Sequence, residues 1–439
     1  MLGLKEKFTL IIKEISYILL IVPVLFLLVN KYPYLLVISV LISILIGIIF
    51  FIKKRVVISF HSELLAILMI IYTYFILSYF VSGQSFFNLL SFQFLRFDGN
   101  FFFCYILFFV FALPAEDYKK LANYYFKFIF IVFTIFSISG IIEYFQNNWS
   151  LMIHTEPDLG KVYFALNFAH NATGSVYAVV CIFLLVFFLK EKEKKLKLLY
   201  IILLLINLAA LFLSKSRANY LGFIISSIIV IWLYYKSIKK FLIAIGIFIV
   251  GSIPVIYFTG AYNRFIQIFQ IGKGTSIVRF FIWEKAWYLF SQSPLFGIGF
   301  GRFNDIFSID RGLFDVERLK GFSGFITFYM KDNFYYDAAH VHNSYLQFLT
   351  ETGVIGLSLV LLFWFLCLVK LLKYYNNLEN SKNDFNKKVF LSAIGSIFVL
   401  LIISFFENYL SATTVMIPVS MLVPLAVGLN FQDKLQAQS

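Results

Sequence analysis

Charged residues and cysteines are scarce in this sequence. Only 14% of the 439 residues are charged, 61% are hydrophobic, and the mean hydropathy is +0.87. Because a soluble domain is about half apolar, this composition argues against one and indicates a polytopic membrane protein. The three cysteines lie far apart without a CxxC pair, so neither a disulfide framework nor a cysteine zinc site is indicated.

Acidic residues are also few, with 23 Asp and Glu against 37 Lys and Arg, which gives a net charge of +14. In a soluble protein this excess would point to nucleic acid. Here the lysines gather in short segments between apolar runs, such as 53–55 and 190–197, as the positive-inside rule describes for cytoplasmic loops. The excess is therefore a topology signal: we expect no nucleic-acid partner and both termini in the cytoplasm.

The apolar runs predict an all-α integral membrane protein with about 12 transmembrane helices. A spanning helix needs about 17 to 25 apolar residues, and the first run has no small-residue cleavage site after it, so we expect it to be retained. The expected spans are near 15–30, 34–52, 63–81, 100–114, 126–145, 172–189, 198–213, 219–235, 240–258, 345–372, 388–406 and 411–429.

These spans divide the chain into residues 1–258 with the first nine helices, a loop subdomain over 259–344, the last three helices over 345–429, and a polar tail over 430–439 that we expect to fray. The outer segments 146–171 and 259–344 are long, whereas the inner ones are short and rich in lysine. The working face is therefore expected outside the cytoplasm.

The long outer loop contains an amphipathic segment. Thr275 and Ser276 can cap a helix over 277–291, which the Ser293-Pro294 pair would stop. Its apolar residues are interrupted by Arg279, Glu284 and Lys285, a pattern typical of a helix on the bilayer surface. Such a helix could roof a cavity. For Arg279 two other interpretations are an ion pair with Glu284 and a contact with lipid phosphate.

A dense polar turn, Ser214 to Arg217, joins two spans at the outer face. Lys215 and Arg217 either extend to lipid headgroups or grip a phosphate, for which the guanidinium fork is well suited. Ser216 lies between them. In the outer segment 146–171, His154, Glu156, Asp158 and His170 are too scattered for a metal site, and the sequons at Asn148 and Asn171 occur at chance level.

Two histidines, His340 and His342, end the long loop where an apolar helix begins. His342 is either a helix-start histidine next to a cap formed by Asn343 or Ser344, or a general base. The positive end of a helix dipole lowers an imidazole pKa and so favours the neutral form that a base requires.

The first turns of the same helix contain Glu351, Gly353 and Gly356. A carboxylate at the start of a span should face protein or water, where it can orient a neighbour. The two glycines, three residues apart on one face, are expected to permit close helix packing.

These residues carry a family resemblance. Arg217 with Leu221, together with His342-Asn343, nine residues, and Gly353 to Gly356, resembles the motif pair of the bacterial O-antigen ligases. The resemblance covers roughly residues 200 to 360 by motif and extends to the wider superfamily of O-antigen ligases and polymerases.

The resemblance implies a C-type membrane glycosyltransferase that moves a glycan from undecaprenyl diphosphate to an acceptor sugar at the outer face of the bacterial inner membrane. Arg217 and Arg279 would hold the donor diphosphate and His342 would take the acceptor proton. Its partners would be this donor, a lipid A-core or glycan acceptor, and membrane lipids; residues in support would be Lys215, Ser216, His340, Asn343 and Glu351.

No cofactor is expected. Many C-type enzymes hold a metal on an acid in the first outer loop, but residues 30–33 contain none. This favours a metal-independent enzyme, and without a carboxylate nucleophile in view we expect inversion at the anomeric carbon.

The sequence leaves three candidate functions. The motif pair favours a ligase that joins O-antigen to lipid A-core, and the alternative is a polymerase that joins O-antigen or capsule repeat units. A transporter would show internal repeats and polar sites in the middle of the membrane, whereas here the polar residues gather at one face.

Overall fold

The computed structural model describes residues 38–48 except 39 and 47, and residues 62–85, 100–112, 117–146, 170–258, 275–303, 340–378 and 384–438. The expected span 15–30, most of 34–52, the short loop 30–33, and His154, Glu156 and Asp158 lie outside these residues. Most of the long loop, over 259–274 and 304–339, also lies outside them.

Every element that the structure describes is a helix. In chain order they are α3 (Ser62–Val81), α5 (Asn100–Ala112), α6 (Tyr118–Gln146), α7 (His170–Lys190), α8 (Lys194–Leu213), α9 (Arg217–Tyr235), α10 (Ile238–Phe258), α12 (Thr275–Gln292), α15 (Ser344–Asn377), α16 (Asp384–Ile403) and α17 (Thr413–Gln438).

Eight of these helices are long and apolar enough to cross a membrane: α3, α6, α7, α8, α9, α15, α16 and α17. Each overlaps one of the expected spans. The helices α5 and α10 occupy two more, near 100–114 and 240–258. The prediction of an all-helical membrane protein is thus confirmed for the described residues.

The bundle has a buried centre and an exposed rim. In α7 and α17, 89% of the spanning window is buried inside the protein, against 28% in α3. Between α6 and α8, the buried Asn207 accepts a hydrogen bond from Ser137 and donates one to Thr134, the kind of polar contact that joins helices where lipid offers no partner.

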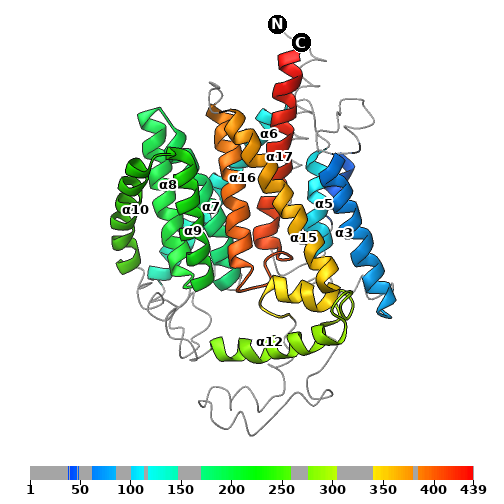
Figure 1. The fold of residues 1–439 in the computed structure, drawn as a ribbon. Helices are drawn as coiled ribbons and strands as arrows, with labels where there is room; N and C mark the ends of the chain where they lie inside the picture. Colours follow the sequence, from blue (N-terminus) through cyan, green and yellow to red (C-terminus); the bar gives the residue numbers. More distant parts are fainter. Residues whose placement is uncertain are drawn as a thin grey trace.

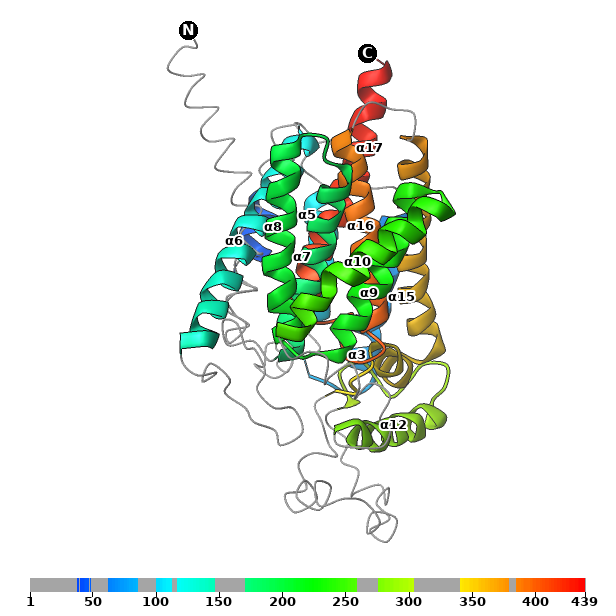
Figure 2. The same ribbon diagram turned by 90° about the vertical axis from the view of Figure 1, so that its left-hand side faces the viewer.

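One helix, α12, lies across an end of this bundle, roughly perpendicular to the other helices (Figures 1 and 2). The connections α8–α9 and α16–α17 and the start of α15 all lie at this same end (Figure 1). The helix predicted over 277–291 is therefore present, with bounds two residues earlier and one later than expected. Its charges do not form an outer polar face, however, because Lys285 is buried and stacks on the Phe303 ring.

At the opposite end of the bundle, α17 continues beyond the membrane-like stretch to Gln438. The helix thus extends into the tail that was expected to fray. Two contacts anchor this extension, since Gln432 accepts a hydrogen bond from the Tyr118 amide and Asp433 accepts one from Asn386.

The helix α15 is broken at Gly353, which has φ 66° and ψ −172°. The segment after α12 enters this break: the Val354 amide donates to the Pro294 carbonyl, and the Ile298 amide donates to the Thr350 carbonyl. A Cβ on Gly353 would collide with the Leu295 carbonyl.

The prediction that Gly353 packs against a neighbouring helix is therefore wrong in its partner, which is the loop that follows α12. The break leaves some backbone N–H and C=O groups of α15 without partners inside the helix. The loop after α12 supplies hydrogen-bond partners for them. Gly356 does serve close packing, against Thr352 and the Tyr74 ring.

Candidate active site

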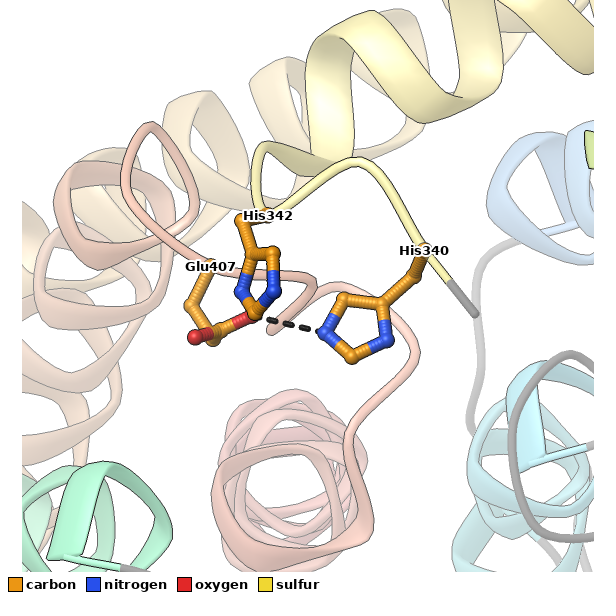
Figure 3. Close-up of side chains that lie close together, drawn as sticks. All are labelled: His340, His342 and Glu407. Atoms are coloured by element: carbon orange, nitrogen blue, oxygen red, sulfur yellow. Dashed lines mark hydrogen bonds and ion pairs between the residues drawn. The ribbon is translucent and has the colours of Figure 1, made fainter. Parts of the chain in front are cut away.

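The site is organised around a carboxylate, Glu407, in the turn between α16 and α17. Its Oε1 lies 2.6 Å from His342 Nδ1 and 2.9 Å from His340 Nε2 (Figure 3). An ionised carboxylate only accepts hydrogen bonds, so each imidazole donates its N–H to it. For His342 this fixes the tautomer and leaves Nε2 as an acceptor.

The ionisation of this cluster follows from its burial. Burial alone would raise the pKa of Glu407, but the two histidines, by charge and hydrogen bonding, hold this pKa well below its usual range. Burial, together with the neighbouring His340 and Arg279, lowers the pKa of His342 against the opposing attraction of Glu407. At neutral pH the pair is therefore a carboxylate with a neutral imidazole. A neutral His342 was expected from the helix dipole, whereas here its main cause is burial.

The backbone around His342 is held by capping bonds. His342 has φ 55°, in the left-handed region, and Asn343 caps α15 by accepting from the Leu346 amide at 3.1 Å. Ser344 donates its hydroxyl to the Glu407 carbonyl at 3.1 Å, and its amide donates to the Ser404 carbonyl. The histidine segment and the Glu407 turn are thus joined.

Arg279 approaches from α12. Its guanidinium Nη2 lies 3.8 Å from Glu407 Oε2, so Arg279 has a carboxylate next to it within the histidine cluster. The neighbouring Trp283 donates its indole N–H to the Val341 carbonyl at 3.1 Å. The helix α12 is in this way tied to the histidine segment that it covers.

Arg217, the first residue of α9, is half-buried. Its charge and that of Arg279 repel each other, which indicates that the two guanidinium groups share one neighbourhood. Lys215, in the same turn, takes the left-handed conformation with φ 53°. Two guanidinium charges against one carboxylate charge favour an anionic ligand here.

Glu351 lies buried behind the histidine segment. Its Oε1 accepts from the Phe303 amide at 3.1 Å and from Gln347 Nε2 at 2.8 Å. Gln347 in turn accepts from the Val341 amide at 2.7 Å. Glu351 therefore orients a neighbour, Gln347, that holds the residue before His342.

Two residues of the cluster were not singled out from the sequence as functional. Glu407 could have been found as the one acidic residue between Asp384 and Asp433 in the printed sequence. Asn171 donates from Nδ2 to Glu407 Oε2 at 3.3 Å, yet its sequon gave no reason to expect this contact.

Among the described residues, His340, His342 and Glu407 could hold a metal ion, because their ligand atoms lie within 4.8 Å of one another. Two histidines with one glutamate form a known zinc set. The positive charge of the Arg279 guanidinium next to Glu407 would repel a metal cation bound at the same carboxylate. The same three residues also form the hydrogen-bonded group described above.

The fold and this polar cluster define a multi-pass helical membrane protein with an anion-favouring site at one end of its bundle. Residues 201–361 match the family model described as O-antigen ligase. This match covers the region that carries the motif pair, and the resemblance to the O-antigen ligases is confirmed.

Two relatives point the same way. The chain is similar to a protein of Rickettsia conorii provisionally named a polysaccharide ligase, with 28% identity over 54% of this chain and 52% of that protein. A protein of Rickettsia typhi with the same name shares 27% identity over 51% of this chain and 49% of that protein. The chain thus spans about half the length of these relatives.

Proposed function

We propose that this protein transfers a glycan from undecaprenyl diphosphate to an acceptor sugar at the outer face of the bacterial inner membrane. The observation that carries the proposal is the His342–Glu407 pair, which leaves His342 Nε2 as an acceptor, with Arg279 next to the same carboxylate. The O-antigen ligase match supports the glycan class of the substrates.

The two arginines supply the donor site. A diphosphate leaving group gains negative charge as the glycosidic bond breaks, and guanidinium groups bind phosphate oxygens in pairs. Arg217 and Arg279 come from α9 and α12 and bring their charges into one neighbourhood. We propose that they hold the diphosphate between the bundle and α12.

His342 acts as the general base in this scheme. The acceptor hydroxyl gives its proton to Nε2, and the resulting imidazolium is stabilised by Glu407, which already holds Nδ1–H. The hydroxyl oxygen attacks the anomeric carbon from the face opposite the diphosphate. The glycosidic bond to the diphosphate breaks, and the configuration inverts.

Reconstituted transfer tests the donor site. We expect Arg217→Ala and Arg279→Ala to abolish transfer while membrane insertion is retained, and Arg217→Lys to rescue poorly because lysine lacks the guanidinium fork. The reaction should survive EDTA, since arginines carry the charge neutralisation. Dependence on added magnesium or manganese would overturn this donor site.

For the acceptor we propose lipid A-core, so that the reaction is O-antigen ligation in lipopolysaccharide biosynthesis. The matched family and the complete motif pair support this choice over repeat-unit polymerisation. In the native host, deletion of the gene should leave bare lipid A-core on a gel while polymerised glycan accumulates on undecaprenyl diphosphate. A single repeat unit on lipid A-core would instead identify a polymerase.

A further inference from the structure

Asn171, the second residue of α7, lies between the turn that carries Arg217 and the carboxylate of Glu407. Its Nδ2 donates to Glu407 Oε2 at 3.3 Å, and its Oδ1 accepts from the Ser216 hydroxyl at 2.8 Å. One side of the amide must therefore donate and the other accept. An aspartate carboxylate at this position could only accept.

The position of Asn171 is fixed by its backbone. Its carbonyl accepts from the Tyr409 hydroxyl at 2.7 Å and from Asn219 Nδ2 at 2.7 Å. One turn further along α7, a Cβ on Gly174 would lie 2.6 Å from Asn219 Nδ2. The helix α7 therefore packs tightly against the start of α9, and the Asn171 amide has little freedom to move.

We propose that Asn171 is a positioning residue that couples the donor half of the site to the proton-accepting half. Through Glu407 it holds the carboxylate that orients His342, and through Ser216 it holds the residue before Arg217. The proposal rests on the transfer reaction proposed above. In this role Asn171 acts through Glu407 in one half and through Ser216 in the other.

Two substitutions of Asn171 distinguish the effect of its contact with Glu407 from the effect of its contact with Ser216. Asn171→Ala removes both bonds, so we expect kcat to fall on the order of 10-fold through a misplaced His342 and the donor KM to rise several-fold. Asn171→Asp keeps an acceptor for Ser216 but sets a carboxylate against Glu407. It should lower kcat while the donor KM stays near the wild-type value.

The chain offers a matched control in Asn207 of α8. This asparagine is buried and makes three hydrogen bonds, with Ser137, Thr134 and the Leu203 carbonyl, inside the bundle. Asn207→Ala should lower Tm in detergent and leave kcat and the donor KM of the folded protein unchanged. A loss of stability alone is thereby distinguished from a loss of positioning.

The measurement uses the full chain in proteoliposomes with a polyprenyl-diphosphate glycan and a saccharide acceptor. If Asn171 acts through His342, then Asn171→Asp should cause no further loss of kcat in a His342→Ala background. An equal loss in both backgrounds, or wild-type kcat and KM in both Asn171 variants, would overturn the proposal.

The same experiment separates this proposal from the function beneath it. If the wild type transfers glycan, His342→Ala loses most of its turnover, and the Asn171 variants match the wild type, only the positioning role is wrong. If the wild type itself fails to transfer from this donor, the proposed function is wrong and the coupling is wrong with it.

Discussion

At the scale of single residues, the two histidines on one carboxylate have unequal expected roles. His342 bonds Glu407 through Nδ1 and keeps Nε2 for a substrate, whereas His340 already uses Nε2 for Glu407. Removing a general base costs on the order of 100-fold in rate. We therefore expect His342→Ala to lose about 100-fold or more in kcat and His340→Ala to lose less, measured as initial rates of glycan transfer.

Glu407→Gln completes this comparison. The amide keeps the shape of the side chain but loses the charge that stabilises a protonated His342, so kcat should fall between the values of the two histidine variants. Wild-type turnover of His342→Ala at normal protein level would return this histidine to the role of a helix-start residue.

The pH dependence follows from the direction of the His342 pKa. A general base must be unprotonated, and burial holds the pKa of His342 below its usual range. As pH falls, activity should be kept through the range near 6.5, where an exposed histidine titrates, and lost only below it. The kcat/KM profile measures this pKa in the free enzyme, and an acidic limb above about 6.5 would contradict the assignment.

The sequence pointed to most of these residues one by one but not to their grouping. Arg217, Arg279 and His342 were found from local chemistry and from the resemblance. Glu407 was missed because a single acid in a short turn has no spacing pattern of its own. Its meaning comes from the contact with residues 65 and 67 positions away in the chain, which only the folded bundle supplies.

At the scale of elements, the break in α15 attaches α12 and its loop to the membrane bundle. Gly353 lies in a backbone region that is essentially restricted to glycine, and a Cβ there would collide with the Leu295 carbonyl. Gly353→Ala should therefore destabilise the protein by about 1–3 kcal/mol from the backbone alone, with a further cost from the collision. The measurement is Tm in detergent.

Gly83 is the matched control for this substitution. It also has a positive φ, 85°, but a Cβ there would meet nothing within 4 Å. Gly83→Ala should thus cost only the backbone strain and lower Tm less than Gly353→Ala. Equal shifts in the two variants would show that the loop does not constrain α15 at Gly353.

The helices themselves were largely predictable, because apolar runs of membrane length are strong signals. Their ends were less so. The helix α16 stops at Ile403 rather than at 406, since the Glu407 turn begins there, and α17 extends into a tail whose composition alone predicted fraying. The break at Gly353 was not predictable, because it depends on a loop some 55 residues earlier in the chain that supplies backbone partners.

At the scale of the whole molecule, the last prediction concerns which end of the bundle faces outward. The candidate site and α12 lie at one end, and Lys190, Lys236 and Lys388 belong to the other ends of their helices. The positive-inside rule assigns the lysine-rich end to the cytoplasm. The candidate site would then face the periplasm, where a ligase meets its lipid-linked substrates.

Cysteine labelling in intact cells tests this orientation. The three native cysteines are buried, so background reaction with a membrane-impermeant maleimide should be low. Gln292 at the end of α12 and Glu193 between α7 and α8 are both exposed, at opposite ends of the bundle. We expect Gln292→Cys to react once the outer membrane is permeabilised and Glu193→Cys to react only after cell lysis. The reverse order would invert the topology and move the site into the cytoplasm, where a ligation at the outer face could not occur.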